Sequence, residues 1–127
     1  MTNQISIQAG PVQMQATLND TSVANMIWDT LPIEASANTW GDEIYFGIPV
    51  DAELENGQEV VELGDLAYWP SGHAFCIFFG RTPASRGDEI RPASSVTVVG
   101  QIQGDPARFK EATSGVRIVI SKSNSES

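Results

Sequence analysis

The chain has 127 residues, of which 41% are apolar, and it carries 16 acidic and 7 basic side chains for a net charge of −9. The charges are distributed unevenly, because residues 1–80 contain eleven acids and no base, whereas residues 81–127 contain five acids and seven bases. This balance argues against nucleic acid or an anionic membrane as partner, since each would meet like charge over most of the chain. The length fits one domain, predicted at residues 1–121, followed by a polar C-terminal tail at 122–127.

Cysteine usage and the lack of long apolar runs indicate the compartment. The single cysteine, Cys76, cannot form an internal disulfide, and the first residues lack a basic segment followed by a long apolar run. No window reaches the ~18 apolar residues that a membrane span requires. We therefore expect a soluble, cytoplasmic protein.

The first elements in the chain are a hairpin and a short helix. Apolar and polar residues alternate over 4–8 and again over 12–18, on either side of a turn at Gly10-Pro11, which predicts two paired strands. Asp20 or Thr21 then caps a short helix that ends before Pro32. The predicted apolar side of this helix consists of Val23, Met26, Ile27 and, at its end, Leu31.

Further short strands follow, separated by turn residues. The six residues 74–79 are all apolar, too few for a helix, and suit a central strand that is covered on both faces. Near the C-terminus, Asp105-Pro106 predicts the start of a short helix over 107–112. The other predicted strands are 33–38, 43–48, 60–63, 66–69, 96–102 and 116–121. Seven or eight strands with two short helices predict a mainly β protein, a closed or nearly closed barrel capped by helices.

The segment 80–95 is a long predicted loop that contains three arginines within eleven residues. Their planar guanidinium groups could hold a carboxylate or a phosphate. Alternatively, they pair with the acids beside them, Asp88 and Glu89. The three arginines are Arg81, Arg86 and Arg91.

Candidates for catalysis or metal binding are few. His73 is the only histidine and follows a glycine in a predicted turn, which is typical of a solvent-facing residue. A strand places residues three apart on opposite faces, so Cys76 is expected to be a buried small hydrophobe rather than the partner of His73. One Cys and one His do not make a zinc site, the acids over 51–62 lack calcium-loop spacing, and glycine-rich phosphate motifs are absent. We expect neither a metal nor a cofactor.

Aromatic residues are concentrated in one part of the chain. Eight of the ten lie between positions 40 and 79, too many for the interior of so small a barrel. They indicate either an aromatic-rich core or an apolar wall that lines a binding pocket. The eight are Trp40, Tyr45, Phe46, Tyr68, Trp69, Phe75, Phe78 and Phe79.

Several segments together resemble one family. Gly-Asp-Leu-Ala-Tyr-Trp-Pro-Ser-Gly at 64–72, Phe-Cys-Ile-Phe-Phe-Gly at 75–80, Thr-Pro at 82–83 and Pro-Ala-Ser at 92–94 are similar to the cyclophilin-like family of small bacterial and archaeal proteins of unknown function. The resemblance covers nearly the whole chain. It implies a cyclophilin-type barrel of eight strands closed by two helices.

The resemblance also bears on prolyl isomerase activity. Residues 44–49, Ile-Tyr-Phe-Gly-Ile-Pro, resemble the strand of true cyclophilins that carries the catalytic arginine, and Phe46 stands where that arginine would be. Phenylalanine cannot polarise a prolyl amide, so the isomerase is the alternative rather than the main hypothesis. An arginine from the 80–95 loop could still supply the guanidinium from another direction.

The main functional prediction is a binding module that takes a small molecule or an extended peptide. Because the first cations of the chain lie in the arginine loop, that ligand is predicted to be anionic. Besides the isomerase, similarity to barrels in small-amide hydrolases suggests a subunit or relative of such enzymes. The predicted groove consists of Tyr45, Phe46, Tyr68, Trp69, Phe75 and Phe78, with His73, Thr82, Arg81, Arg86 and Arg91 as its polar groups.

Overall fold

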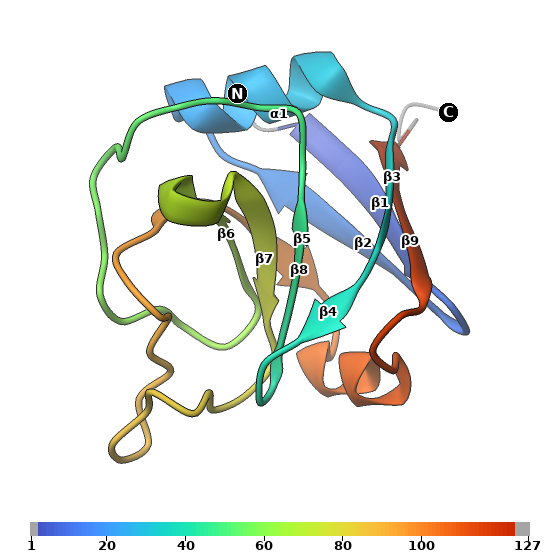
Figure 1. Cartoon of the computed structure of the whole chain (residues 1–127). Helices are drawn as coiled ribbons and strands as arrows, with labels where there is room; N and C mark the ends of the chain where they lie inside the picture. Colours follow the sequence, from blue (N-terminus) through green and yellow to red (C-terminus); the bar gives the residue numbers. More distant parts are fainter. Residues whose placement is uncertain (1–2, 124–127) are drawn as a thin grey trace.

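The computed structural model of the chain describes residues 3–123 and shows one strongly curved antiparallel sheet (Figure 1). Within this part of the chain, nine strands follow the order β3-β9-β1-β2-β8-β6-β7-β5-β4 and form a nearly closed barrel. The strands are β1 (Asn3–Ala9), β2 (Val12–Leu18), β3 (Ile33–Ser36), β4 (Asn38–Thr39), β5 (Glu43–Gly47), β6 (Asp65–Trp69), β7 (Ala74–Phe78), β8 (Thr97–Gln103) and β9 (Arg117–Lys122). The mainly β barrel is therefore confirmed, with nine strands in place of about eight.

The helix α1 (Ser22–Thr30) covers one end of the barrel (Figure 1). Thr21 is its N-cap, because the side-chain oxygen accepts a hydrogen bond from the Ala24 N–H at 3.1 Å. Val23 and Ile27 are buried as predicted, whereas Met26 is 39% exposed. The third buried residue of the helix is Ala24, which the prediction did not include.

Two short 3₁₀ helices complete the helical structure of the described chain. η1 (Pro70–Gly72) joins β6 to β7, and η2 (Pro106–Glu111) covers the end of the barrel opposite α1 (Figure 1). Asp105 caps η2 by accepting a hydrogen bond from the Ala107 N–H at 3.0 Å, as its position before proline predicted. The expectation of two helices is thus corrected to one α-helix and two 3₁₀ turns in residues 3–123.

Two predicted strands differ from the structure. The 33–38 segment is divided into β3 and β4 at the buried Ala37, where the chain crosses between the two edges of the sheet. The 60–63 segment is not a strand, and Val61 forms only an isolated bridge with Ile90. The reason is its position: residues 50–64 run outside the barrel as a long loop beside the 80–96 loop (Figure 1). Of the apolar residues in this segment, Val61 packs in the outer cluster, whereas Val60 and Leu63 are exposed.

The strand β7 is buried on both faces, which confirms that part of the prediction from its apolar run, but it is seventh in the order of nine strands and not at the centre of the sheet. It pairs with β5 on one side and β6 on the other. Alternate residues therefore supply two separate hydrophobic clusters. Ile44, Phe46, Phe75 and Ile77 belong to the cluster inside the barrel, whereas Cys76 and Phe78 belong to a second cluster on its outer face.

The C-terminal strand extends further than predicted. β9 includes Lys122, whose ammonium lies 4.7 Å from the ring centre of Trp28 on α1. The remainder of the predicted tail, residues 124–127, lies outside the described residues. No helix in residues 3–123 has the length and apolar character needed to cross a membrane.

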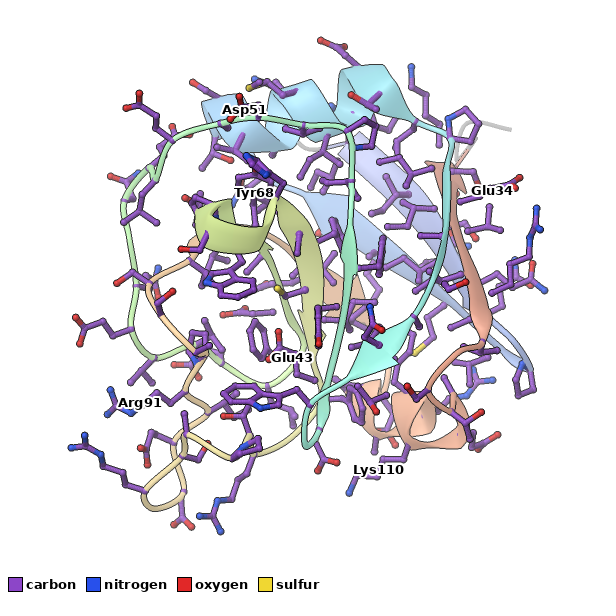
Figure 2. All side chains as sticks on the ribbon, in the orientation of Figure 1. Glu34, Glu43, Asp51, Tyr68, Arg91 and Lys110 are labelled. Atoms are coloured by element: carbon purple, nitrogen blue, oxygen red, sulfur yellow. The ribbon has the colours of Figure 1, made fainter. Side chains whose placement is uncertain are left out.

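Tyr68 connects the start of the 50–64 loop to the barrel through hydrogen bonds. Its side chain is buried, its hydroxyl donates to the Val50 carbonyl at 2.6 Å, and it accepts from the Ala52 N–H at 3.3 Å. Figure 2 shows Tyr68 directly beside the segment that carries Asp51. Burial raises the pKa of this phenol, so it stays a neutral donor.

We predict that Tyr68→Phe lowers the free energy of unfolding by about 1–2 kcal/mol, because the Val50 carbonyl loses its buried donor. Tyr45→Phe is the matched control, since the Tyr45 side chain is only partly buried; its cost should be within about 0.5 kcal/mol. Urea unfolding of both variants measures the difference. Equal effects would show that the Tyr68 hydroxyl does not fasten the loop.

Candidate functional site

A pocket of about 220 Å³ opens on the outer face of the barrel, between strands β5, β6 and β7 and the 80–96 loop. It is smaller than pockets for drug-sized molecules, which typically occupy about 300–1,000 Å³. Its walls are largely apolar. The lining residues are Trp40, Glu43, Tyr45, Trp69, Cys76, Pro92, Ala93 and Val96.

Strand alternation places the floor of the pocket. In an antiparallel pair, residues two apart point to the same face, so Glu43 and Tyr45 of β5 point outward together. Tyr45 lies opposite Cys76 of β7 in the register of the two strands. Residues of the other parity on β5, Ile44 and Phe46, point into the barrel.

The turn between β4 and β5 places Trp40 above this floor. The Trp40 N–H donates to the Glu43 carbonyl at 2.9 Å, which closes a tight four-residue turn. Gly41 adopts a φ of +62° in this turn, and a Cβ there would lie 2.8 Å from the Pro83 ring. The turn is also tied to the arginine loop, because the Asp42 N–H donates to the Arg81 carbonyl at 2.9 Å.

Trp69, at the end of β6, forms another wall. Its indole N–H donates to the Ser94 hydroxyl oxygen at 2.6 Å, which links the strand to the loop. Gly72 of η1 lies against the ring, since a Cβ there would be 2.7 Å from the Trp69 Cζ3 atom. The indole polar atom is therefore occupied, and the ring is held between η1 and the loop.

The loop wall is ordered by its own hydroxyl groups. The buried Thr82 hydroxyl donates to the Arg91 carbonyl, and the Ser85 hydroxyl oxygen accepts from the N–H groups of Thr82 at 3.1 Å and Arg91 at 3.3 Å. Bridges from Gln58 to Val96 and from Val61 to Ile90 join this loop to the 50–64 segment. Thr82 therefore stabilises the part of the loop that includes Pro92, which lines the pocket, but Thr82 itself is not a lining residue.

Glu43 is the charged residue of the pocket lining. Only 6% of it is exposed, and its carboxyl group accepts a hydrogen bond from the Cys76 thiol. Burial raises the pKa of Glu43 to about 7, and the weak thiol bond offsets this only in part. The carboxyl group therefore exchanges its proton near neutral pH.

Cys76 and His73 do not form a nucleophilic pair. Burial, and then the neighbouring Glu43 carboxyl, raise the pKa of the Cys76 thiol well above its usual value, so the thiol is neutral and a poor nucleophile. His73 lies on the surface in a left-handed conformation (φ 47°), and its Nε2 is 3.3 Å from the Asp51 carboxylate. These placements agree with the expectation of a solvent-facing histidine and a buried cysteine.

The six aromatic residues predicted to line one groove are divided between the two faces of the sheet. Tyr45 and Trp69 line the pocket. Phe46 and Phe75 are stacked inside the barrel with ring centres 5.5 Å apart, and Tyr68 is in the same interior cluster. Phe78 is buried in the outer cluster next to the pocket without lining it. The structure therefore does not bring these six side chains into one groove, because neighbouring residues of a strand point to opposite faces.

The three arginines lie outside the pocket lining. Arg81 and Arg86 are exposed, and the Arg91 guanidinium pairs with Glu89 at 3.3 Å. The N–H groups of Arg86 and Gly87 hold the pKa of Glu89 at about 2. Figure 2 shows Arg91 at the outer edge of the loop, whereas Glu43 lies near the centre of the view. In the described part of the chain, no three Cys, His or carboxylate side chains are grouped closely enough to hold a metal ion.

Sequence reasoning did not single out several lining residues: Trp40 as a wall, Glu43, Pro92, Ala93 and Val96. One signal for Glu43 was present. It is an acid two positions before Tyr45 on a predicted strand, so period-two alternation puts both on one face. The loop residues carry no such signal, because their position depends on tertiary contacts.

The barrel and its helical caps define a cyclophilin-like protein. The cyclophilin-like family model matches residues 3–121, so the chain belongs to this family. The solution structure of a hypothetical protein from Archaeoglobus fulgidus is 40% identical, with a TM-score of 0.80 over 95% of each chain. No curated protein matches the chain. The comparisons thus identify the family and the fold.

We predict that, because of the Glu43 carboxyl group, the free energy of unfolding decreases as the pH rises. Its folded pKa of about 7 lies above the ordinary glutamate value of 4.5, so its contribution is fully present below about pH 4.5 and is lost as the pH rises through 7. Glu43→Gln removes this titration. The free energy of unfolding of the native protein should fall relative to that of the variant by up to about 3 kcal/mol between about pH 4 and pH 8.

Urea unfolding at several pH values measures this difference. The buried carboxyl group of Asp65, whose pKa is also raised by burial, is common to both proteins and cancels in the comparison. Parallel pH profiles for the two proteins would contradict the assignment of a desolvated carboxyl group at position 43.

Proposed function

We propose that this protein is a binding module that holds a small organic molecule in the outer-face pocket. The observation that carries the proposal is the pocket itself: a cavity of about 220 Å³ with aromatic walls and one buried carboxyl group. Small-molecule sites characteristically combine apolar walls with a few polar groups that orient the ligand. The size suits a small ligand, or one side chain of a peptide.

The walls are preorganised for binding. The tight turn at Gly41 fixes the backbone of Trp40, and the ring of Trp69 is held by Ser94 and Gly72. Rings that are already fixed lose little conformational freedom when a ligand binds, which favours affinity. The loop wall is likewise ordered by the bonds of Thr82 and Ser85.

The two alternative functions find less support in the geometry. None of the eight lining residues is an arginine, and Phe46, which stands at the position compared with the catalytic arginine, lies in the interior cluster. For amide hydrolysis, the lining offers the neutral thiol of Cys76 in place of an activated nucleophile. Binding without turnover is therefore the function that the site supports best.

The three tryptophans provide an internal test of where ligands bind. We expect fragments from a screen of small organic molecules to shift the indole NMR signals of Trp40 and Trp69, which line the pocket. The signal of Trp28, which belongs to α1 and lies beside Lys122, should stay unchanged. A screen in which no fragment shifts the two pocket signals, or in which Trp28 shifts equally, would contradict the proposal.

A substitution that fills the pocket provides a second test of the same site. We predict that Ala93→Phe places a ring in the pocket and weakens binding of the screened fragments by about tenfold or more. Ala107→Phe is the control, because Ala107 is exposed on η2 at the far end of the barrel. Equal affinities for the two variants would show that the fragments bind elsewhere.

A further inference from the structure

We infer that the ligand of the outer-face pocket is a small organic cation, an alkylated ammonium ion, held by the rings of Trp40, Tyr45 and Trp69 and by the carboxylate of Glu43. The inference rests on the proposed function, that this pocket binds a small molecule, and adds the class of ligand.

The walls are suited to a cation because they are aromatic. The faces of Trp and Tyr rings attract cations, and aromatic cages are a common way of holding quaternary ammonium groups. Three of the eight lining residues carry such rings. The Trp69 N–H already donates to Ser94, so this residue presents ring carbon rather than a free polar donor.

None of the side chains that line the pocket is basic. Glu43 is 94% buried, given its 6% exposure, and lines the pocket. None of the ion pairs formed within residues 3–123 includes it, whereas Glu34, Asp42 and Glu89 each pair with a basic side chain. Its hydrogen-bond partner is the Cys76 thiol, a weak donor. A bound cation would supply the opposite charge that a buried carboxylate requires.

Hydrogen-bonding capacity selects among cations. A primary ammonium has three N–H donors and needs three acceptors. Apart from the Glu43 carboxylate and the Tyr45 hydroxyl, the polar groups of the lining side chains are the Cys76 thiol and the indole N–H groups of Trp40 and Trp69, which donate and do not accept. An alkylated ammonium has few or no donors to satisfy. A cavity of about 220 Å³ holds roughly seven water volumes, which matches an ion of about the size of choline.

The charge of the surroundings favours the same sign. The chain has a net charge of −9, and its acidic body attracts cations over a distance. The sequence-based prediction of an anionic ligand depended on the arginine loop, and no observation tests it. In the structure, Arg91 is paired with Glu89 and lines the adjoining hollow, and Glu43 is the charged residue that faces the ligand. An ionised Glu43 would repel a carboxylate or phosphate.

The test compares choline with its uncharged carbon isostere, 3,3-dimethylbutan-1-ol, which has nearly the same shape. Both are titrated at constant ionic strength near pH 8 while the indole signals of Trp40 and Trp69 are followed by NMR. We expect choline to bind at least about tenfold more tightly than the isostere. Glu43→Gln should remove most of that preference, whereas Glu53→Gln, which removes an exposed acid outside the pocket, should leave it intact.

The alternative results overturn the inference in distinguishable ways. If the isostere binds as tightly as choline, or if Glu43→Gln leaves the preference intact, the pocket binds small molecules but is not selective for cations. If neither compound shifts the Trp40 and Trp69 signals, the cation inference is likewise overturned. The proposed function is then tested separately by the fragment screen and the Ala93→Phe variant, whose results do not depend on the charge of the ligand.

Discussion

The pairing of β5 with β7 is the constraint on which the remainder of the structure depends. It fixes Tyr45 opposite Cys76 and Phe46 opposite Phe75, and so divides the aromatic residues of this region between two faces of one sheet. The inward set completes the barrel core, in which Phe46 and Phe75 stack. The outward set remains uncovered until other segments fold over it. A slip of one residue in this register would exchange the two sets.

The outer face is covered by the two long loops, 50–64 and 80–96, which form a second hydrophobic cluster with it. Val61, Ile90 and Val96 seal most of this face, and the pocket remains where the cover is incomplete. The carboxyl group of Glu43 lies at that gap, largely desolvated and bonded to a thiol. Burial of this carboxyl group is electrostatically unfavourable, and the stability of the interior cluster does not depend on it. A buried group with a perturbed pKa in a pocket is the pattern expected of a functional site.

Much of the fold followed from the sequence because local patterns set it: the alternation in β1 and β2, the cap at Thr21, and the apolar run of β7. The residues of the site were harder to predict. Grouping Tyr45 and Phe46 in one groove overlooked the period of two, although that rule was available from the sequence alone. The position of Pro92 in the pocket wall had no local signal, because long-range contacts of the loop set it.

The most direct test of this account is an NMR titration of the Glu43 side-chain carboxyl carbon in the unliganded protein. If the register of β5 and β7 buries this group beside the Cys76 thiol, its midpoint should lie near pH 7. A midpoint near the ordinary glutamate value of about 4.3 would mean that the carboxyl group is solvated. The pocket would then lack the buried charge on which the proposed ligand class depends.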